Sequence, residues 1–204
     1  MPIDEMLAIY DDELNQIGVA PRAEAHARGL LHQVVHCWLI AKSHTEDWLY
    51  LQQRSLRLSS FPGWYDIAAA GHIDLNESPE HAVIRETREE LGVVIEPSKL
   101  EHVGVFREAF EFDSYRDYEI CQVYLYPVDE VEFHLGDEVE RMVKVSLTEF
   151  ARCLDDQLSP MAALTLGDHR AVSMHPCHVF LHNREYLASV FDYIRGRESR
   201  RGTD

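Results

Sequence analysis

Three glutamates, Glu86, Glu89 and Glu90, have a spacing that could bind a metal ion. On an α-helix this spacing places their carboxylates along one edge. Their mutual repulsion disfavours the helix by roughly 0.2–0.5 kcal/mol per pair, and a cation bound between them would reverse that effect. Carboxylates on a rigid element suit a hard ion such as Mg²⁺ or Mn²⁺, which also binds phosphates. These residues alone also allow a solvated acidic helix, with Arg85 and Arg88 in surface ion pairs.

A helix that carries the glutamates is predicted over residues 79–91. Ser78 followed by Pro79 is typical of a helix start, because the hydroxyl caps free N–H groups and proline needs no partner there. Gly92 is typical of a helix end. At helical periodicity four residues share a side that can face a core: Val83, Ile84, Thr87 and Leu91.

The residues around this helix resemble the Nudix box, Gly-x5-Glu-x7-Arg-Glu-U-x-Glu-Glu-x-Gly-U, in which U is a bulky aliphatic residue. Every charged and glycine position is matched, and the one departure is Thr87 at the first U. The resemblance implies an α/β fold, an α/β/α sandwich with a mixed β-sheet and the box as a loop–helix–loop. The matching residues are Gly71, Glu77, Arg85, Glu86, Glu89, Glu90, Gly92 and Val93.

The resemblance also implies a role for each box residue. The chemistry is hydrolysis of a diphosphate that is linked to another group, in which Mg²⁺ or Mn²⁺ neutralises phosphate charge and activates a water. The catalytic base is left open, and Glu138 outside the box is one alternative to a box glutamate. The expected catalytic set is Glu77, Arg85, Glu86 and Glu89, with Arg85 orienting the glutamates and Glu77 as its partner. The expected box ligands are Glu86, Glu89, Glu90 and a carbonyl at Ala70 or Gly71.

A closer resemblance, over roughly residues 4–150, is to the Nudix subgroup related to isopentenyl-diphosphate isomerase. It rests on three runs, Gly29-Leu30-Leu31-His32-Gln33-Val34-Val35-His36, Phe61-Pro62-Gly63-Trp64 and Ala70-Gly71-His72. The isomerase has Cys-Gly-His where this chain has Ala70-Gly71-His72, so the catalytic thiol is lost. The Glu-x-Glu pair of the isomerase corresponds to Asp117-Tyr118-Glu119 in this chain. Isomerisation is therefore disfavoured, but the resemblance allows His72 and Glu119 to extend the metal site, with a lesser expectation for His32.

Three further residues are predicted to bind substrate, namely Arg54, Trp64 and His32. Each has a structural alternative, since a loop tryptophan such as Trp64 often closes a core and a histidine at a strand end often only packs. Glu119 lies on an apolar strand, where burial of an acid is costly without a partner. Asp117, in contrast, is expected to be a solvated turn residue.

Composition restricts the partners. The net charge of −17 opposes binding to a nucleic-acid backbone, which depends on clustered Lys and Arg. The four cysteines are scattered and are expected to be free buried thiols of a cytoplasmic protein. No stretch approaches the length of a membrane span, and the N-terminus does not resemble a signal peptide. The expected partner is a small-molecule diphosphate, and a homodimer, common in the family, is left open.

The chain is predicted to divide into an N-terminal hairpin and lead-in (1–30), a Nudix domain (31–155) and a C-terminal extension of the same domain (156–204). Residues 156–180 are expected to be irregular, and 195–204 to form a frayed basic tail. Strands are predicted over 33–40, 48–54, 67–70, 100–112, 118–128 and 139–145, and helices over 79–91, 148–154 and 183–194.

The leading functional hypothesis is a metal-dependent pyrophosphohydrolase that acts on a nucleoside diphosphate derivative or a similar small molecule. Two alternatives remain, isoprenoid-diphosphate chemistry and a Nudix-fold module that binds nucleotide without turnover. Loss of box glutamates would favour the module, and none is lost.

Overall fold

The computed structural model describes residues 5–43, 45–112, 115–129, 131–156, 159–175, 178–179 and 182–201. The helices are α1 (Arg22–Arg28), α2 (Pro79–Leu91), the 3-10 turn η1 (Pro97–Lys99), α3 (Leu147–Asp155) and α4 (Arg184–Arg201). The strands are β1 (Met6–Tyr10), β2 (Gln16–Pro21), β3 (His32–Ala41), β4 (Trp48–Arg54), β5 (Tyr65–Ile67), β6 (Ala69–His72), β7 (Glu101–Phe112), β8 (Tyr115–Val128), β9 (Val139–Ser146), β10 (Met161–Thr165) and β11 (Ala171–Met174).

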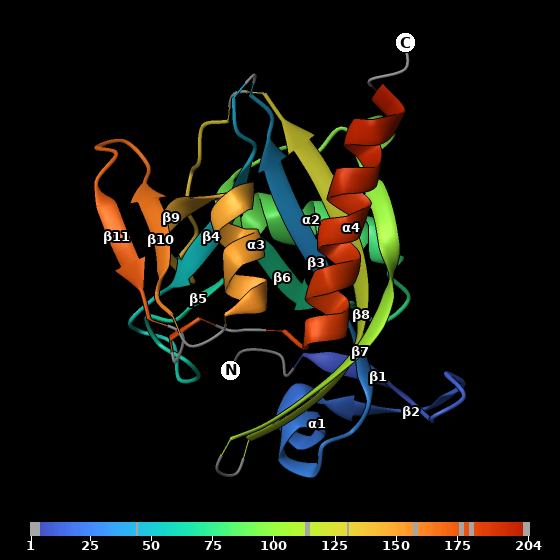
Figure 1. Ribbon diagram of the computed structural model, residues 1–204. Helices are drawn as coiled ribbons and strands as arrows, with labels where there is room; N and C mark the ends of the chain where they lie inside the picture. Colours follow the sequence, from blue (N-terminus) through green and yellow to red (C-terminus); the bar gives the residue numbers. More distant parts are fainter. Residues whose placement is uncertain are drawn as a thin grey trace.

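Strand β3 is the centre of a mixed sheet (Figure 1). It runs parallel to β8, with His32 opposite Glu119, and antiparallel to β4 and β6. Beyond β8 lies β7, and beyond β4 lie β9, β10 and β11. The hairpin β1–β2 joins the sheet at Ile9, opposite His32. Because of this register, two residues predicted to belong to the site, His32 and Glu119, lie side by side on neighbouring strands.

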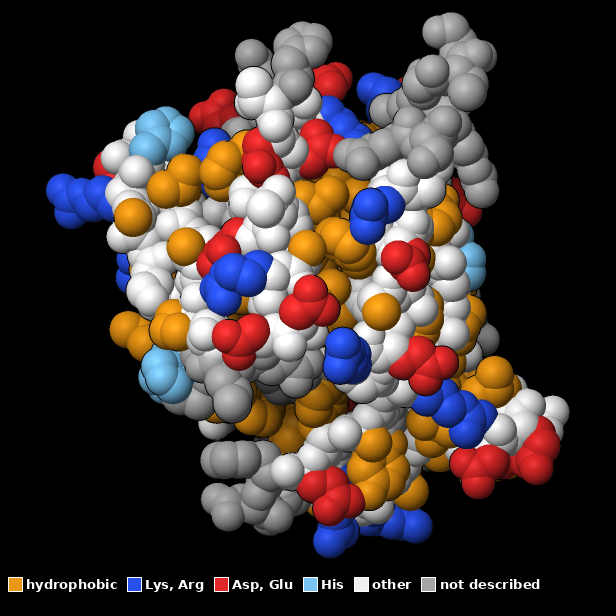
Figure 2. Space-filling model, in the orientation of Figure 1, with side chains coloured by type: hydrophobic (Ala, Val, Ile, Leu, Met, Phe, Trp, Pro, Cys, Tyr) orange, Lys and Arg blue, Asp and Glu red, His pale blue; other side chains and the backbone are white. Residues whose placement is uncertain are grey.

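Helices cover both faces of the sheet, which confirms the predicted α/β architecture (Figure 1). On one face, Trp38 and Leu125 pack with Leu187 of α4 and Phe150 of α3. On the other face, Val83 and other α2 residues pack against the sheet. A shallow groove lined by both apolar and polar side chains lies between α3 and α4 (Figure 2). None of the described helices is long and apolar enough to cross a membrane.

The box helix begins and ends where the sequence predicts. Ser78 Oγ accepts a hydrogen bond from the His81 N–H at 3.2 Å, and Gly92 has a φ of 67° at the C-cap. Three residues of its predicted core face are buried, with exposed fractions of 1% or less (Val83, Thr87 and Leu91). Burial of this face anchors α2 and compensates for the repulsion along its acidic edge.

Three predictions about the structure are wrong, and one helix was missed. Residues 161–174 are not irregular, since β10 and β11 pair with each other and β10 pairs with β9. The expected tail is helical as far as Arg201, and Arg197 pairs with Glu101 at 2.5 Å, which holds that end of α4 to β7. A short helix that was not predicted, α1, spans Arg22–Arg28. Asp117 is a β8 residue with an exposed fraction of 8%, not a solvated turn residue.

The cysteine prediction is confirmed for Cys37, Cys121 and Cys153, which are free and buried. The fourth, Cys177, lies outside the described residues.

Candidate active site

A cavity of about 300 Å³ opens beside α2. Its mouth carries exposed charged groups, because the side chains of Glu89, Asp74 and Arg22 are 61%, 58% and 49% exposed. Its floor is polar and consists of His36, Asp66 and His182, which are buried, and Glu119, whose side chain is 12% exposed. All three box glutamates line this cavity, as do Arg54, His72, Arg85 and Glu138.

Arg85 holds the acidic edge of α2 in place. Its guanidinium donates to both carboxylate oxygens of Glu77, at 3.0 and 2.8 Å, and to the His72 carbonyl at 3.0 Å. It also donates to Glu86 at 2.7 Å and to Glu89 at 3.4 Å. The predicted contact with Glu77 is therefore present. Because the guanidinium is planar and has five donors, it fixes loop, helix and strand relative to one another.

Gly71 allows Glu86 to approach the backbone of β6. A Cβ atom at this position would lie 2.1 Å from Glu86 Cδ, so no larger residue fits without moving the carboxylate. Burial raises the pKa of Glu86 to about 7, although Arg85 opposes the shift. A nearby cation would favour the charged form of such a carboxyl group and so offset the effect of burial.

Glu90 is buried at the inner end of the box helix. Its Oε2 accepts from Gln52 Nε2 at 3.0 Å and from the Ala70 N–H at 3.4 Å. Burial, followed by repulsion from Glu86, raises the pKa of Glu90 well above its ordinary value. Two buried carboxylates in one cavity fit the chemistry of a divalent cation, which would favour their charged forms.

Arginines provide the positive charge of the cavity. Arg54 donates from Nη2 to the Ser60 carbonyl at 3.3 Å, while its buried Nε has no hydrogen-bond partner among the described residues. Arg22 lines the mouth. Trp64, predicted to bind substrate, is not a lining residue of this cavity. Its ring packs 5.0 Å from that of Phe61, and Phe61 and Tyr115 are aromatic residues that line the cavity.

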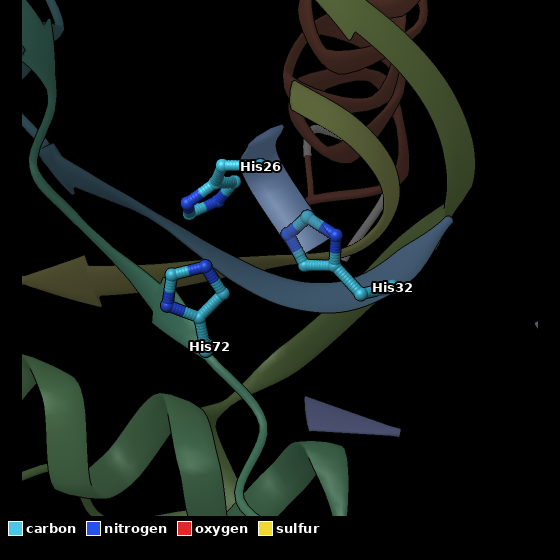
Figure 3. A group of neighbouring side chains, drawn as sticks. All are labelled: His26, His32 and His72. Carbon is cyan, nitrogen blue, oxygen red and sulfur yellow. The ribbon is translucent and has the colours of Figure 1, made fainter. Parts of the chain in front are cut away.

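Three histidines surround one space beside the cavity (Figure 3). The ring centroids of His26, His32 and His72 lie 5.2–5.4 Å apart. His32 Nδ1 contacts the Leu30 carbonyl at 2.8 Å, and His72 Nδ1 contacts Glu5 at 3.1 Å. These oxygen partners at Nδ1 fix the rings of His32 and His72 and leave Nε2 of both rings for a metal ion. This arrangement is common around metal-binding histidines.

Asp117 completes this histidine site. Its Oδ1 lies 3.4 Å from Nε2 of both His26 and His32. These three buried atoms form no hydrogen bond within the described part of the chain. Burial lowers the pKa of His32 to about 4, so its ring is neutral at pH 7. Two imidazoles and a carboxylate with unsatisfied buried atoms fit a divalent metal ion.

Beneath the cavity floor the polar residues continue into a buried network. Glu119 Oε2 lies 3.9 Å from His36 Nε2 and 3.6 Å from Cys121 Sγ. His36 Nδ1 contacts the Tyr186 hydroxyl at 3.1 Å, and Glu108 pairs with His182. Because His36 and Glu108 already have these partners, we assign the buried set of His36, Glu108 and Cys121 to this network and not to a metal site.

Most of the predicted site residues thus line one cavity. Trp64, Glu77 and His32 do not line it, although Glu77 contacts Arg85 and His32 lies in the histidine site beside it. His26 and Gln52 are among the residues that the prediction missed, as are Asp66 and His182. His26 lies on the unpredicted helix α1, and Gln52 lies on a strand whose sequence carries no signal of a contact with Glu90. The position of Asp117 in the site could have been predicted from the sequence. Asp117, Glu119 and Cys121 alternate along β8, so their side chains share one face of the strand.

The comparisons with known proteins agree with this architecture. The family model described as the NUDIX domain matches residues 30–164. An uncharacterized Nudix hydrolase of Clostridium acetobutylicum is 35% identical over 163 residues, which cover 78% of this chain and 79% of the relative. Isopentenyl-diphosphate Delta-isomerase 1 of Photorhabdus laumondii is 29% identical over 123 residues, which cover 59% of this chain and 68% of the relative.

Solved structures show the same fold. The MutT/nudix family protein from Enterococcus faecalis has a TM-score of 0.58 and 18% identity, over 80% of this chain and 62% of that one. A protein from Deinococcus radiodurans has a TM-score of 0.56 and 20% identity, over 74% of this chain and 90% of that one. Fold and site together define the Nudix class of α/β proteins. By its domain match and its Clostridium relative, the chain belongs to the Nudix hydrolase family, as the sequence pattern predicted.

Proposed function

We propose that the protein is a pyrophosphohydrolase that uses Mg²⁺ or Mn²⁺ to cleave the diphosphate of a nucleoside diphosphate derivative. The observation that carries this proposal is that Glu86, Glu89 and Glu90 line one cavity together with Arg54 and Arg22. Carboxylates hold a cation and guanidinium groups hold phosphate, so the cavity has a complementary group for each part of a metal–diphosphate complex.

The box glutamates would hold the metal, and the histidine site would offer a second position. A divalent ion supplies charge neutralisation of the phosphates and activation of a water. Arg85 keeps Glu86 and Glu89 in place, and Arg54 faces the diphosphate. A carboxylate that is not engaged with a metal, such as Glu138, takes the proton of the attacking water.

Isomerisation of an isoprenoid diphosphate is the weaker alternative. The isomerase relative and the three histidines favour it. However, the cavity presents the methyl group of Ala70 where the isomerase pattern has a thiol, and a methyl group cannot exchange protons with carbon. The alternative is therefore retained only as an outcome of the test.

The test is a hydrolysis screen with Mg²⁺ or Mn²⁺ against nucleoside diphosphates, nucleotide sugars, dinucleotides, coenzyme A and isoprenoid diphosphates. Each compound is run with the wild type, with Glu86→Gln, and with Glu80→Gln as a matched control on the exposed side of the same helix. The proposal expects a hydrolysed compound whose turnover falls by at least about 100-fold in Glu86→Gln and is unchanged in Glu80→Gln.

Three results would count against the proposal. Equal turnover by Glu86→Gln would exclude the box as the site. Isomerisation of isopentenyl diphosphate without phosphate release would favour the isomerase alternative. Metal and nucleotide binding without turnover of any compound would identify a binding module.

A further inference from the structure

His182 is a buried cavity residue that comes from outside the segment matched to the family. The match ends at residue 164, whereas His182 immediately precedes α4 in the C-terminal extension. Its exposed fraction is 4%, and its ring lies edge-on to that of Tyr186, with centroids 4.7 Å apart. The extension therefore contributes directly to the cavity floor.

Both ring nitrogens of His182 face carboxylates. Nδ1 is hydrogen-bonded to Glu108 Oε2 on β7, and Nε2 lies 3.6 Å from Asp66 Oδ1 on β5. The other oxygen of Glu108 accepts from the Asn183 N–H at 2.7 Å, so that carboxylate cannot rotate away. A neutral imidazole has only one N–H, whereas an imidazolium can donate to two acceptors. The arrangement therefore fits a protonated His182 between two anions.

Electrostatics agree with this geometry. Burial alone would lower the pKa of His182, but the contacts with Asp66 and Glu108 outweigh it and raise the pKa to about 9. The groups that face the ring come from every neighbouring element, and include a second histidine and a third acid. They are Asp66 (β5), Glu108 (β7), His36 (β3), Glu119 (β8) and Tyr186 (α4), and Cys121 lies next to Glu119.

Asp66 is a member of this group that can reach a ligand, as are His36 and Glu119, which also line the cavity. Asp66 lines the cavity, and its Oδ1 accepts the Ile67 N–H at 2.8 Å while facing His182. Its Oδ2 forms no hydrogen bond with the described residues. A hydrocarbon group placed here would leave Asp66 Oδ2 desolvated without a donor, whereas a hydroxyl group would donate a hydrogen bond to it.

We propose that His182 is a positioning residue that fixes Asp66 as the hydrogen-bond acceptor for a hydroxylated, sugar-like group of the substrate at the cavity floor. This inference rests on the proposed diphosphate hydrolysis and specifies its substrate class as diphosphates that carry a polyhydroxylated group. Prenyl diphosphates are rejected, because they offer no donor to the floor.

The first test compares ADP-ribose with isopentenyl diphosphate, both with Mg²⁺, as substrates of the wild type and of His182→Gln. The matched control is His102→Gln, at an exposed position of β7. We expect kcat/KM for ADP-ribose to fall by about 10- to 100-fold in His182→Gln, with little change for isopentenyl diphosphate and none in the control. Asp66→Asn should lose as much, and the double variant no more, because the two residues act as a unit.

The pH profile separates this role from a purely structural one. The preference of the wild type for ADP-ribose should decline as pH rises through about 9, and this decline should be absent in His182→Gln. Equal losses on both substrates, additive losses in the double variant, or an unchanged alkaline limb would overturn the proposal.

A second measurement needs neither turnover nor a folded variant. In ¹⁵N-histidine-labelled wild type, NMR should show a His182 ring that keeps both N–H groups up to about pH 9 and shifts on addition of ADP-ribose but not of isopentenyl diphosphate. A ring that is neutral at pH 7.5, or that shifts equally with both compounds, would overturn the proposal. If ADP-ribose were not hydrolysed but still shifted the His182 resonances selectively, the result would count against the proposed hydrolysis. It would not count against the proposed recognition of a hydroxylated group at the cavity floor.

Discussion

Replacement of Gly71 by alanine tests whether the close approach of Glu86 to β6 builds the metal site. The added Cβ would lie 2.1 Å from Glu86 Cδ and 2.3 Å from Glu86 Oε1. Ordinary carbon–carbon contacts lie near 3.5 Å, so the carboxyl group must move by about 1.4 Å. Metal ligands tolerate errors of only about 0.2 Å.

A displacement of this size should be costly for catalysis and tolerable for folding. Misplacement of a reacting group by about 1 Å can reduce a rate by about 100-fold, which corresponds to about 2.7 kcal/mol in the activation free energy. Overpacking costs typically about 1–3 kcal/mol in stability, less than a domain's usual total of about 5–15 kcal/mol. We therefore expect a folded Gly71→Ala protein with Mn²⁺ affinity and kcat/KM both reduced by at least about 100-fold.

The assay combines Mn²⁺ binding by electron paramagnetic resonance, hydrolysis of the best compound of the screen, and thermal unfolding. Gly18→Ala is the matched control, because a Cβ there has no heavy atom within 4 Å. If folded Gly71→Ala bound Mn²⁺ and turned over substrate within a few-fold of the wild type, the assignment of Glu86 as a ligand held against β6 would be refuted.

Three further predictions concern the charged groups of the site. Arg85→Lys should lower the free energy of unfolding, measured by urea titration, by about 1–2 kcal/mol. The reason is that lysine has no planar guanidinium group with which to bridge Glu77 and Glu86. An unchanged urea midpoint would contradict this prediction. The pKa of Glu86 is raised from 4.5 to about 7, so the metal-free folded state binds more protons, and stability should fall as pH rises through that window. Mg²⁺ should restore stability above pH 7 in thermal melts, and a flat profile would oppose the assignment. His26→Ala should reduce the number of Co²⁺ ions bound, measured by calorimetry, whereas His81→Ala, at an exposed position of α2, should not.

The parts of the site that could be predicted from the sequence are those encoded locally. The box helix, its caps and its edge of glutamates follow from spacing within about 15 residues, because helical periodicity converts sequence separation directly into geometry. The Arg85–Glu77 contact came from the family resemblance and is present at 2.8 Å. The α/β sandwich likewise followed from the resemblance, and the solved relatives share it.

The parts that could not be predicted depend on strand register and on distant segments. Glu119 stands beside His32 because β8 runs parallel to β3, and opposite Glu108 because β7 pairs with β8 in one particular register. A shift of one residue would turn each of these side chains to the other face. Periodicity shows which residues of a strand share a face, but not which strand lies next to it. His26 and His182 were missed because both come from segments outside the box, and sequence periodicity does not show where distant segments pack.

The distribution of charge around α2 shows how one helix serves both stability and function. Its core face, with Val83 and Leu91 fully buried, holds the helix against the sheet whether or not a cation is present. Folding opposes the charge of its acidic edge despite the contacts with Arg85 and Gln52, because Glu86 and Glu90 enter a cavity where burial raises the pKa of both carboxyls. Folding therefore holds these carboxylates close together in a setting that favours their protonated forms. A divalent cation is the ligand that would relieve this conflict most fully, so the proposed metal binding would couple metal affinity to folded-state stability through the same two glutamates.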